Sequence, residues 1–197
     1  MLARDSIGLI EFRSIADGMK VLDAMAKRAD FEILEAMPVC PGKYVVLVGG
    51  ELADVEFAME RGVELGGDGI LGVVLIPDLH PEVLPAITRE AKQLPSVEAV
   101  GIIETRTIAG TIAAADAAAK EADVSILKIR LSHDLGGKGL TVLTGTQSSV
   151  EAAVARGKAA TMESGGVTAT AIIEQPHPIM SAELFMTESR PHLHLGQ

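Results

Sequence analysis

One stretch near the N-terminus constrains the fold most, because the chain contains it twice. Residues 7–13 read IGLIEFR, and residues 100–106 read VGIIETR. The segment DAMAK at 23–27 returns as DAAAK at 116–120, and the match continues, with small slips in the loops, to a His-Pro pair at the far end of each copy. A long period that occurs only twice is typical of a duplicated domain rather than a solenoid of short units. The chain is therefore predicted to hold two copies of one small fold.

The duplication divides the 197 residues into two predicted domains. The first spans 1–95 and includes a connector, and the second spans 96–197 and includes a C-terminal tail. Each is long enough to bury a core of its own. Within the connector, prolines bracket a helix expected over 82–93, which makes the linkage semi-rigid.

Hydrophobic periodicity predicts the order β-α-β-β-α-β in each copy, an α+β fold whose helices cover one face of a sheet. In the first copy, strands are expected over 7–13, 31–39, 44–48 and 70–76, with helices beginning after Ser14 and at Glu51. In the second copy, strands are expected over 99–106, 124–131, 140–144 and 167–174, with helices over 108–122 and 147–163. Gly49 and Gly50 are expected to break the third strand. The alanine-rich helix at 108–122 favours close approach to another helix more than a place in a deep core.

Composition excludes several classes of function. The net charge of −10, the absence of Trp and the single Tyr argue against a nucleic-acid partner, which needs basic and aromatic surface. Hydrophobic residues make up 48% of the chain, yet no apolar run reaches the roughly 18 residues of a membrane span, so large interfaces between domains or chains are expected instead. We expect no secretory signal, and one cysteine fits a reducing cytoplasm. No nucleophile and base are paired in the sequence, which predicts a protein that is not an enzyme.

Two motifs are interpreted as structural. The glycines at 67–72 have the G-x-G-x-x-G spacing, but they follow a predicted helix and lead into a strand, the reverse of a dinucleotide-binding turn. His192 and His194 resemble a metal-binding pair, but they lie in a C-terminal tail where little preorganisation is expected.

Cys40 is open to two interpretations. A lone cysteine is more often an inert core residue than a ligand. Cys40, however, is followed by Pro-Gly in a turn between two predicted strands, and such loops are exposed and often functional. One thiolate cannot hold a metal cluster, whereas three could if three chains met at this loop.

Taken together, these motifs resemble the tandem-domain shell proteins of bacterial microcompartments, the BMC-T class. The resemblance runs from Ser6 to about Pro178 and rests on the GLIE and GIIE openings, the two Asp-x3-Lys segments and the two His-Pro pairs. It implies two tandem, non-permuted BMC domains, and three chains forming a ring that resembles a hexamer. Such rings tile edge to edge into the shell of an organelle in the cytoplasm, a structural role.

The resemblance also implies roles for individual residues. Lys27 and Lys120 match a lysine at the ring edge, where neighbouring tiles meet. The loops between the second and third strands of each copy line the central pore: Val39, Cys40, Pro41, Gly42 and Lys43 in the first, and His133, Asp134, Gly136 and Gly137 in the second. In the propanediol-utilization branch of the family, to which this chain is especially similar, the pore loop carries the same Cys-Pro-Gly-Lys run. That similarity implies one [4Fe-4S] cluster per trimer, held by three Cys40 thiolates and serving electron transfer across the shell.

The expected partners are further copies of this chain, other shell proteins and a redox enzyme, with neither nucleic acid nor membrane. Two alternatives stay open: a tile whose pore passes a metabolite, with Cys40 a bystander, and a tandem sensor domain of the same plan. His133 does not belong to the pore pattern of that branch. It could gate the pore, bind a second metal or simply occupy a longer loop.

Overall fold

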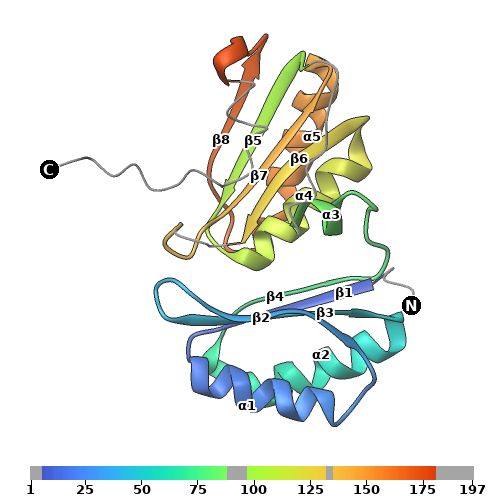
Figure 1. Cartoon of the computed structure of the whole chain (residues 1–197), viewed down its shortest axis with the longest axis vertical. Coiled ribbons are helices and arrows are strands. Elements are labelled where there is room, and N and C mark those ends of the chain that lie inside the picture. Colours follow the sequence, from blue (N-terminus) through green and yellow to red (C-terminus); the bar gives the residue numbers. More distant parts are fainter. Residues whose placement is uncertain (1–5, 88–96, 132–134, 181–197) are drawn as a thin grey trace, which may run out of the picture.

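The structure, a computed structural model, describes residues 6–87, 97–131 and 135–180. It consists of two halves, each a four-stranded antiparallel sheet with two long helices (Figure 1). The first half contains β1 (Ser6–Phe12), α1 (Ile15–Ala26), β2 (Glu32–Val39), β3 (Lys43–Gly50), α2 (Leu52–Gly66) and β4 (Ile70–Ile76). After α3 (Val83–Ile87), the second half repeats this order with β5 (Ala99–Thr105), α4 (Ile108–Glu121), β6 (Val124–Leu131), β7 (Gly139–Gly145), α5 (Gln147–Ala160) and β8 (Val167–Glu174).

The two sheets have the same topology. Their strand orders are β2-β3-β1-β4 and β6-β7-β5-β8, so the first strand of each half lies in the middle of its sheet. The predicted α+β fold and its element order are confirmed. The glycines at 67–72 do follow a helix, α2, and lead through a 3-10 turn into β4. No helix of the described residues is long and apolar enough to cross a membrane.

Three details of the sequence prediction are wrong or only partly tested. Gly49 and Gly50 do not break the third strand, since they pair with Ile7 and Ser6 inside the ladder. A Cβ on Gly49 would lie 2.9 Å from Leu34, so at this position glycine makes room for a packed side chain. The connector helix covers only Val83–Ile87 of the expected 82–93, and residues 88–96, with the predicted domain boundary, lie outside the described part. Helix α5 ends at Ala160 rather than near 163, where a 3-10 turn takes over.

The long helices begin at equivalent caps in both halves. The Ser14 hydroxyl accepts a hydrogen bond from the Asp17 N–H at 3.2 Å, and the Thr107 hydroxyl accepts one from Gly110 at 3.0 Å. These caps satisfy one of the N–H groups that a helix leaves unpaired in its first turn. Both helices are thereby fixed at the same point relative to the strand that precedes them.

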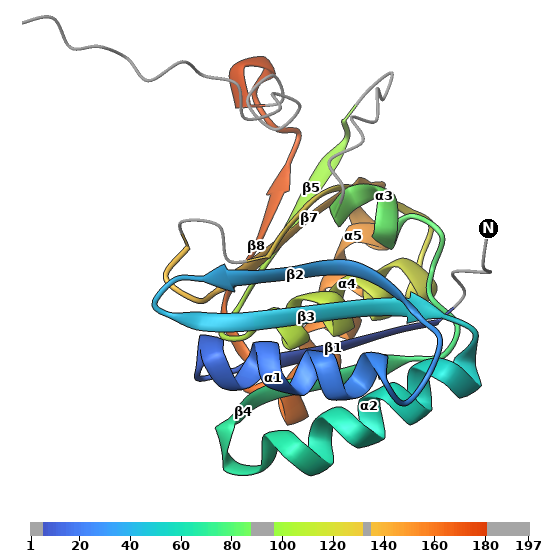
Figure 2. The ribbon, with the colours of Figure 1, turned by 60° about the horizontal axis from the view of Figure 1, so that its bottom comes forward.

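Three hydrophobic clusters hold the molecule together. One lies between the first sheet and helices α1 and α2, and another between the second sheet and helices α4 and α5. The largest cluster crosses from one half to the other: Ile7 and Leu9 on the open face of the first sheet pack with α4, around Ile108 and Ile112. Figures 1 and 2 show the second half lying over the face of the first sheet that α1 and α2 leave uncovered.

Helix α4 differs from its prediction in one respect. It does approach α5 closely: a Cβ on Gly157 would lie 2.9 Å from the Ala114 carbonyl oxygen. Most of its residues are nevertheless buried, because one side of the helix faces its own sheet and another side faces the sheet of the first half. The small alanines thus fit a helix between two layers, and the expectation that it would avoid a deep core is wrong.

Candidate functional site

The loop that carries Cys40 is a tight turn between β2 and β3. The Gly42 N–H donates a hydrogen bond to the Val39 carbonyl oxygen at 2.9 Å, and the Cys40–Pro41 peptide bond is cis. Gly42 has a φ of 95°, in the left-handed region that glycine adopts without cost. The Cys40 side chain is exposed at the tip of this turn, as its position in the sequence predicted.

The equivalent loop of the second half lies directly beside it. Gly136 and Gly137, between β6 and β7, both have left-handed backbone conformations. A Cβ on Gly137 would lie 3.3 Å from the Cys40 carbonyl oxygen and 3.1 Å from the Lys43 ammonium. The structure therefore brings together predicted pore-loop residues from both copies, while His133 and Asp134 lie outside the described residues.

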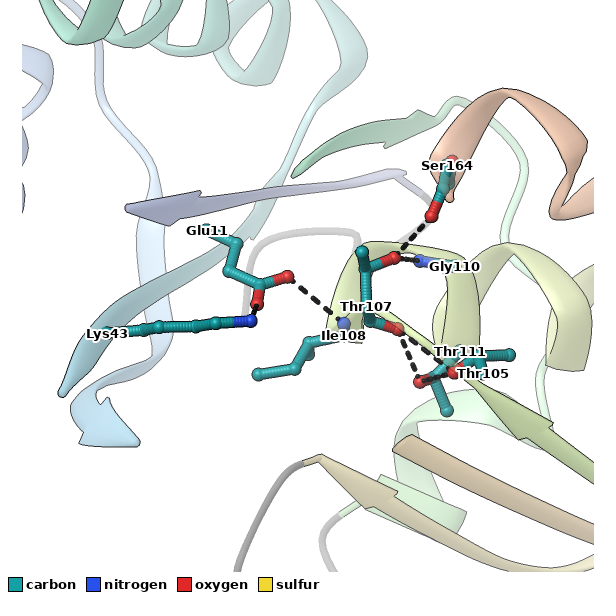
Figure 3. A network of polar contacts seen from close by, with 8 residues as sticks. All are labelled: Glu11, Lys43, Thr105, Thr107, Ile108, Gly110, Thr111 and Ser164. Carbon is teal, nitrogen blue, oxygen red and sulfur yellow. Dashed lines mark hydrogen bonds and ion pairs between the residues drawn. The ribbon is translucent and has the colours of Figure 1, made fainter. Parts of the chain in front are cut away.

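A buried ion pair holds the base of the Cys40 loop. The Lys43 ammonium donates to Glu11 Oε1 at 2.6 Å, and the other carboxylate oxygen, Oε2, accepts from the Ile108 N–H at 3.1 Å (Figure 3). The Glu11 side chain has no exposed surface. A carboxylate at a helix N-terminus is stabilised by the helix dipole as well as by its hydrogen bonds. Glu11 thus ties the first sheet, the Cys40 loop and α4 to one another.

Sequence reasoning did not find this pair. The signal was present, because Glu11 returns as Glu104 and Lys43 as Lys138. In the second half these residues form the same ion pair, with Lys138 Nζ 2.7 Å from Glu104 Oε1. A glutamate and a lysine preserved at equivalent places in both copies could have indicated a pair.

Threonines fix the N-terminus of α4, to which Glu11 binds. The Thr107 hydroxyl caps the helix and donates to the Ser164 carbonyl oxygen at 2.5 Å, and the Thr105 and Thr111 hydroxyls lie 2.6 Å apart (Figure 3). Thr105 and Thr111 are fully buried. This network orients the Ile108 N–H toward the first half, so the joint between the halves is preorganised.

The two lysines that match the family's edge position have different surroundings. Lys27 pairs with Asp23 at 2.6 Å on the exposed side of α1. Lys120 pairs with Asp116 at 2.8 Å and also donates to the carbonyl oxygen of Asp78, just after β4. Lys120 remains 40% exposed. Both ammonium groups therefore lie at the surface of the chain, which leaves their edge role a prediction.

The chain by itself supplies one thiol to a metal centre. Within residues 6–87, 97–131 and 135–180, no group of three or more His, Cys, Asp or Glu side chains is placed to hold a metal ion. The Cys40 thiol is exposed at the tip of its turn and is therefore accessible to a centre shared between chains.

Comparison with known proteins assigns the fold. A family model described as the BMC domain matches residues 6–79 and again residues 99–176. The bacterial microcompartment shell protein PduT of Citrobacter freundii is 35% identical over 175 residues, which cover 89% of this chain and 95% of that protein. The carboxysome shell protein CsoS1A of Hydrogenovibrio crunogenus is 34% identical over 90 residues, covering 44% of this chain and 94% of that protein.

A solved structure agrees with this assignment. The crystal structure of a microcompartment protein from Desulfitobacterium hafniense matches with a TM-score of 0.78 and 42% identity, over 90% of this chain and 98% of that one. The resemblance seen in the sequence is thereby confirmed over nearly the whole chain. The chain belongs to the BMC-domain family, and its two domains, matched end to end by such relatives, make it a structural shell protein of a bacterial microcompartment of the tandem-domain kind.

Proposed function

We propose that three copies of this shell protein form a ring of six BMC domains, with domain boundaries near residues 95 and 96. The ring is a tile of the microcompartment shell and joins other shell proteins at its edge. The membership of the chain in the BMC-domain family supports a tile. The Cys40 turn and the Gly136–Gly137 loop line the central pore, and their side-by-side position supports this placement.

The same proposal assigns Cys40 a ligand role. Three Cys40 thiolates, one from each chain, hold a [4Fe-4S] cluster at the pore. The observation that carries this assignment is an exposed thiol at the tip of the turn between β2 and β3, with Gly137 of the equivalent loop beside it. A bound cluster of this kind accepts and releases one electron, which suits exchange with a redox enzyme across the shell. The ion pair of Lys43 with Glu11 holds the base of the turn in position.

Iron analysis tests the cluster. The protein is purified and reconstituted without oxygen, and iron and acid-labile sulfide are measured per chain for the wild type and Cys40→Ala. We expect about four iron atoms for every three wild-type chains and none in the variant, as one cubane per ring requires. A well-reconstituted wild type without iron would leave Cys40 a pore-lining thiol and favour a pore that passes a small molecule. Sedimentation of both proteins verifies that they assemble alike.

A separate experiment tests the tile edge. Lys27 is 73% exposed, so Lys27→Ala is expected to leave the fold and the ring unchanged while lowering sheet formation at low salt. Electron microscopy measures the extent of sheet formation, and sedimentation measures whether the chains form rings. If Lys27→Ala formed sheets as extensive as those of the wild type, Lys27 would have no role at the tile edge. A wild-type protein that forms neither rings nor sheets would instead favour the sensor alternative.

A further inference from the structure

Strand β4 is the last strand of the first sheet, and its outer edge has no strand partner among the described residues. The strand order β2-β3-β1-β4 places β1 on one side of β4 and no described strand on the other. Alternate N–H and C=O groups of an edge strand point away from its sheet. Between Leu71 and Ile76, no side chain or loop of the described segments forms a hydrogen bond with β4. The outer edge of β4 is therefore able to pair with a further strand.

Among the edge strands of the two described sheets, β4 alone lacks residues that discourage such pairing. Charged side chains, proline and covering segments protect edge strands from other chains. β2 contains two glutamates and a proline, β6 contains a lysine and an arginine, and β8 ends in a glutamate. The edge of β6 is also occupied, since its Ile126 N–H donates to the Glu82 carboxylate at 2.7 Å. In contrast, β4 reads ILGVVLI, without a charged residue or a proline.

A groove runs along the same edge on the helix side of the first sheet. It has a volume of about 550 Å³ and lies between α2 and β4 (Figure 2), with an apolar floor formed by Met59, Val63, Val73 and Leu75. Val73 and Leu75 are 37% and 36% exposed. They are alternate residues of β4, so both point to the same side of the strand. A strand added to the outer edge of β4 would place every second side chain over this floor.

Three carboxylates line the groove along α2. Glu56, Glu60 and Glu64 recur every four residues, and all three side chains are exposed. Only Glu64 has an ion-pair partner among the described residues, Arg61 at 2.7 Å. Like charges four residues apart destabilise a helix, so the stability of α2 does not explain this row. A row of carboxylates beside an apolar floor complements a segment that combines apolar side chains with lysine or arginine.

The second half does not repeat this groove. A Cβ on Gly62 would meet Ile10, and a Cβ on Gly157 would meet Ile103, which aligns α2 with α5. In this alignment and in the strand pairing of β8, the equivalents of Glu60, Val63, Glu64 and Val73 are Ala155, Lys158, Ala159 and Thr170. The acidic row and part of the apolar floor therefore belong to the first half alone, and the second half supplies matched control positions.

We propose that the outer edge of β4 binds an extended segment of a partner protein, which adds a further strand to the first sheet. The main-chain groups of this segment pair with β4 and supply affinity, and its groove-facing side chains supply specificity. Apolar side chains cover Met59 and Val73, and the long side chain of a lysine or arginine reaches Glu56 or Glu60 while its stem covers the floor. The site involves neither the Cys40 loop nor Lys27, so it adds a binding function to those proposed above.

A synthetic peptide tests the site on the full-length chain. The probe is fluorescein-Lys-Thr-Leu-Thr-Lys-Thr-Leu-Lys-amide, which as a strand presents lysine and leucine on one side and mainly threonine on the other. Fluorescence anisotropy at low salt measures its dissociation constant. We expect saturable binding to the wild type that added salt weakens, because the contact includes ion pairs. A wild-type protein that does not bind the probe overturns the proposal.

Two methylated isomers of the probe separate strand pairing from contact through side chains alone. One isomer has N-methyl groups on the odd-numbered residues of the peptide, and the other has them on the even-numbered residues. A paired strand directs alternate N–H groups to its neighbour, so we expect one isomer to lose binding and the other to retain it. If both isomers bound like the unmodified probe, the peptide would not be adding a strand to β4.

Protein variants locate the binding site. Val73→Lys places a charge on the outer edge of β4, and Glu60→Lys reverses a charge beside the groove; both positions are exposed. We expect each variant to raise the dissociation constant of the probe about tenfold or more. The matched controls are Thr170→Lys on β8 and Ala155→Lys on α5, also exposed, which should bind the probe like the wild type. Equal dissociation constants for Val73→Lys and Thr170→Lys would overturn the proposal.

Sedimentation without the probe distinguishes a partner protein from a second copy of this chain. If the outer edge of β4 is kept for another protein, Val73→Lys sediments like the wild type. A smaller assembly for Val73→Lys than for Thr170→Lys would mean that copies of the chain occupy this edge themselves, and it would overturn the proposal.

Discussion

The carboxylate of Glu11 and the ammonium of Lys43 lie 2.6 Å apart, with the carboxylate wholly buried between the two domains and 20% of the lysine side chain exposed. One residue is in the centre of the first sheet, and the other is at the foot of the Cys40 turn. The pair therefore connects the packing of the domains with the geometry of the loop proposed to line the pore. It is one of several relationships that make definite predictions.

Removing the carboxylate should be costly. Glu11→Ala leaves the Lys43 ammonium and the Ile108 N–H without their acceptor, and breaking such a buried pair from one side costs about 3–5 kcal/mol of unfolding free energy. Denaturant unfolding at a fixed protein concentration measures the loss. Arg61→Ala, which breaks an exposed pair on α2, is the control and should change stability by less than about 1 kcal/mol. Similar losses for the two variants would show that the Glu11 pair is not a buried anchor.

The loop glycines should differ in their tolerance of a side chain. Gly137→Ala places a Cβ 3.1 Å from the Lys43 ammonium and 3.3 Å from both the Cys40 carbonyl oxygen and Pro41 Cδ, so the two loops must separate. Gly136→Ala is the matched control, because it also has a left-handed backbone but no heavy atom within 4 Å of its Cβ. Both variants bear the conformational cost of about 1–2 kcal/mol for a left-handed alanine.

We therefore expect Gly137→Ala to change the rate at which a thiol reagent modifies Cys40 and to lower its iron content after reconstitution. Gly136→Ala should resemble the wild type in both measurements. Identical reaction rates for the two variants would mean that Gly137 does not position the Cys40 turn.

Helix α5 should not accept a larger residue where it meets α4. Gly157→Ala would gain about 1 kcal/mol from helix propensity, but the new Cβ meets the Ala114 backbone oxygen at 2.9 Å and forces the helices apart, at a typical cost of 1–3 kcal/mol. The expected net effect on thermal unfolding is a lower midpoint. Ala155→Gly, an exposed position on the same helix, calibrates the propensity contribution. A Gly157→Ala variant more stable than the wild type would show that the helices can separate freely.

The Asp116 carboxylate should protect one backbone amide in particular. Asp116→Ala removes the acceptor of the His80 N–H, and a charge-assisted hydrogen bond of about 1.5–3 kcal/mol predicts amide exchange at His80 faster by about tenfold or more. Native-state hydrogen exchange measures it, with the Val83 amide, bonded to the His80 carbonyl at 3.0 Å, as internal reference. Equal acceleration at both amides would indicate general loosening of the turn instead.

Local sequence patterns predicted the elements and their order well. Strands β4, β6 and β8 lie at the predicted residues, because runs rich in apolar and β-branched residues between turn residues leave little ambiguity. The prediction of a strand end at Gly49–Gly50 was wrong because a glycine inside a strand looks, in sequence, like the end of a strand. The Leu34 side chain of the neighbouring strand β2 occupies the space that a side chain at Gly49 would need. Whether a glycine lies inside a strand is therefore determined by contacts with other strands rather than by the local sequence.

The candidate site was predictable in its residues but not in its arrangement. A turn signal beside Cys40 predicted an exposed thiol, which the structure confirms. The contact of Gly137 with the Cys40 loop and the burial of Glu11 depend on how one domain docks on the other. No periodicity within a single copy encodes that docking. The ligand and edge roles stay predictions, since they depend on neighbouring chains.

The two domains are parts of one chain and one hydrophobic cluster spans both, so they always occur in equal numbers, side by side. An assembly built from separate single-domain proteins would have to sort two kinds of subunit by affinity alone. Here the covalent chain performs the sorting, so mutations in the loop between β2 and β3 can accumulate without appearing in the loop between β6 and β7. In the proposed ring, a single cysteine codon places a thiol at every second loop and leaves the intervening loops to evolve independently.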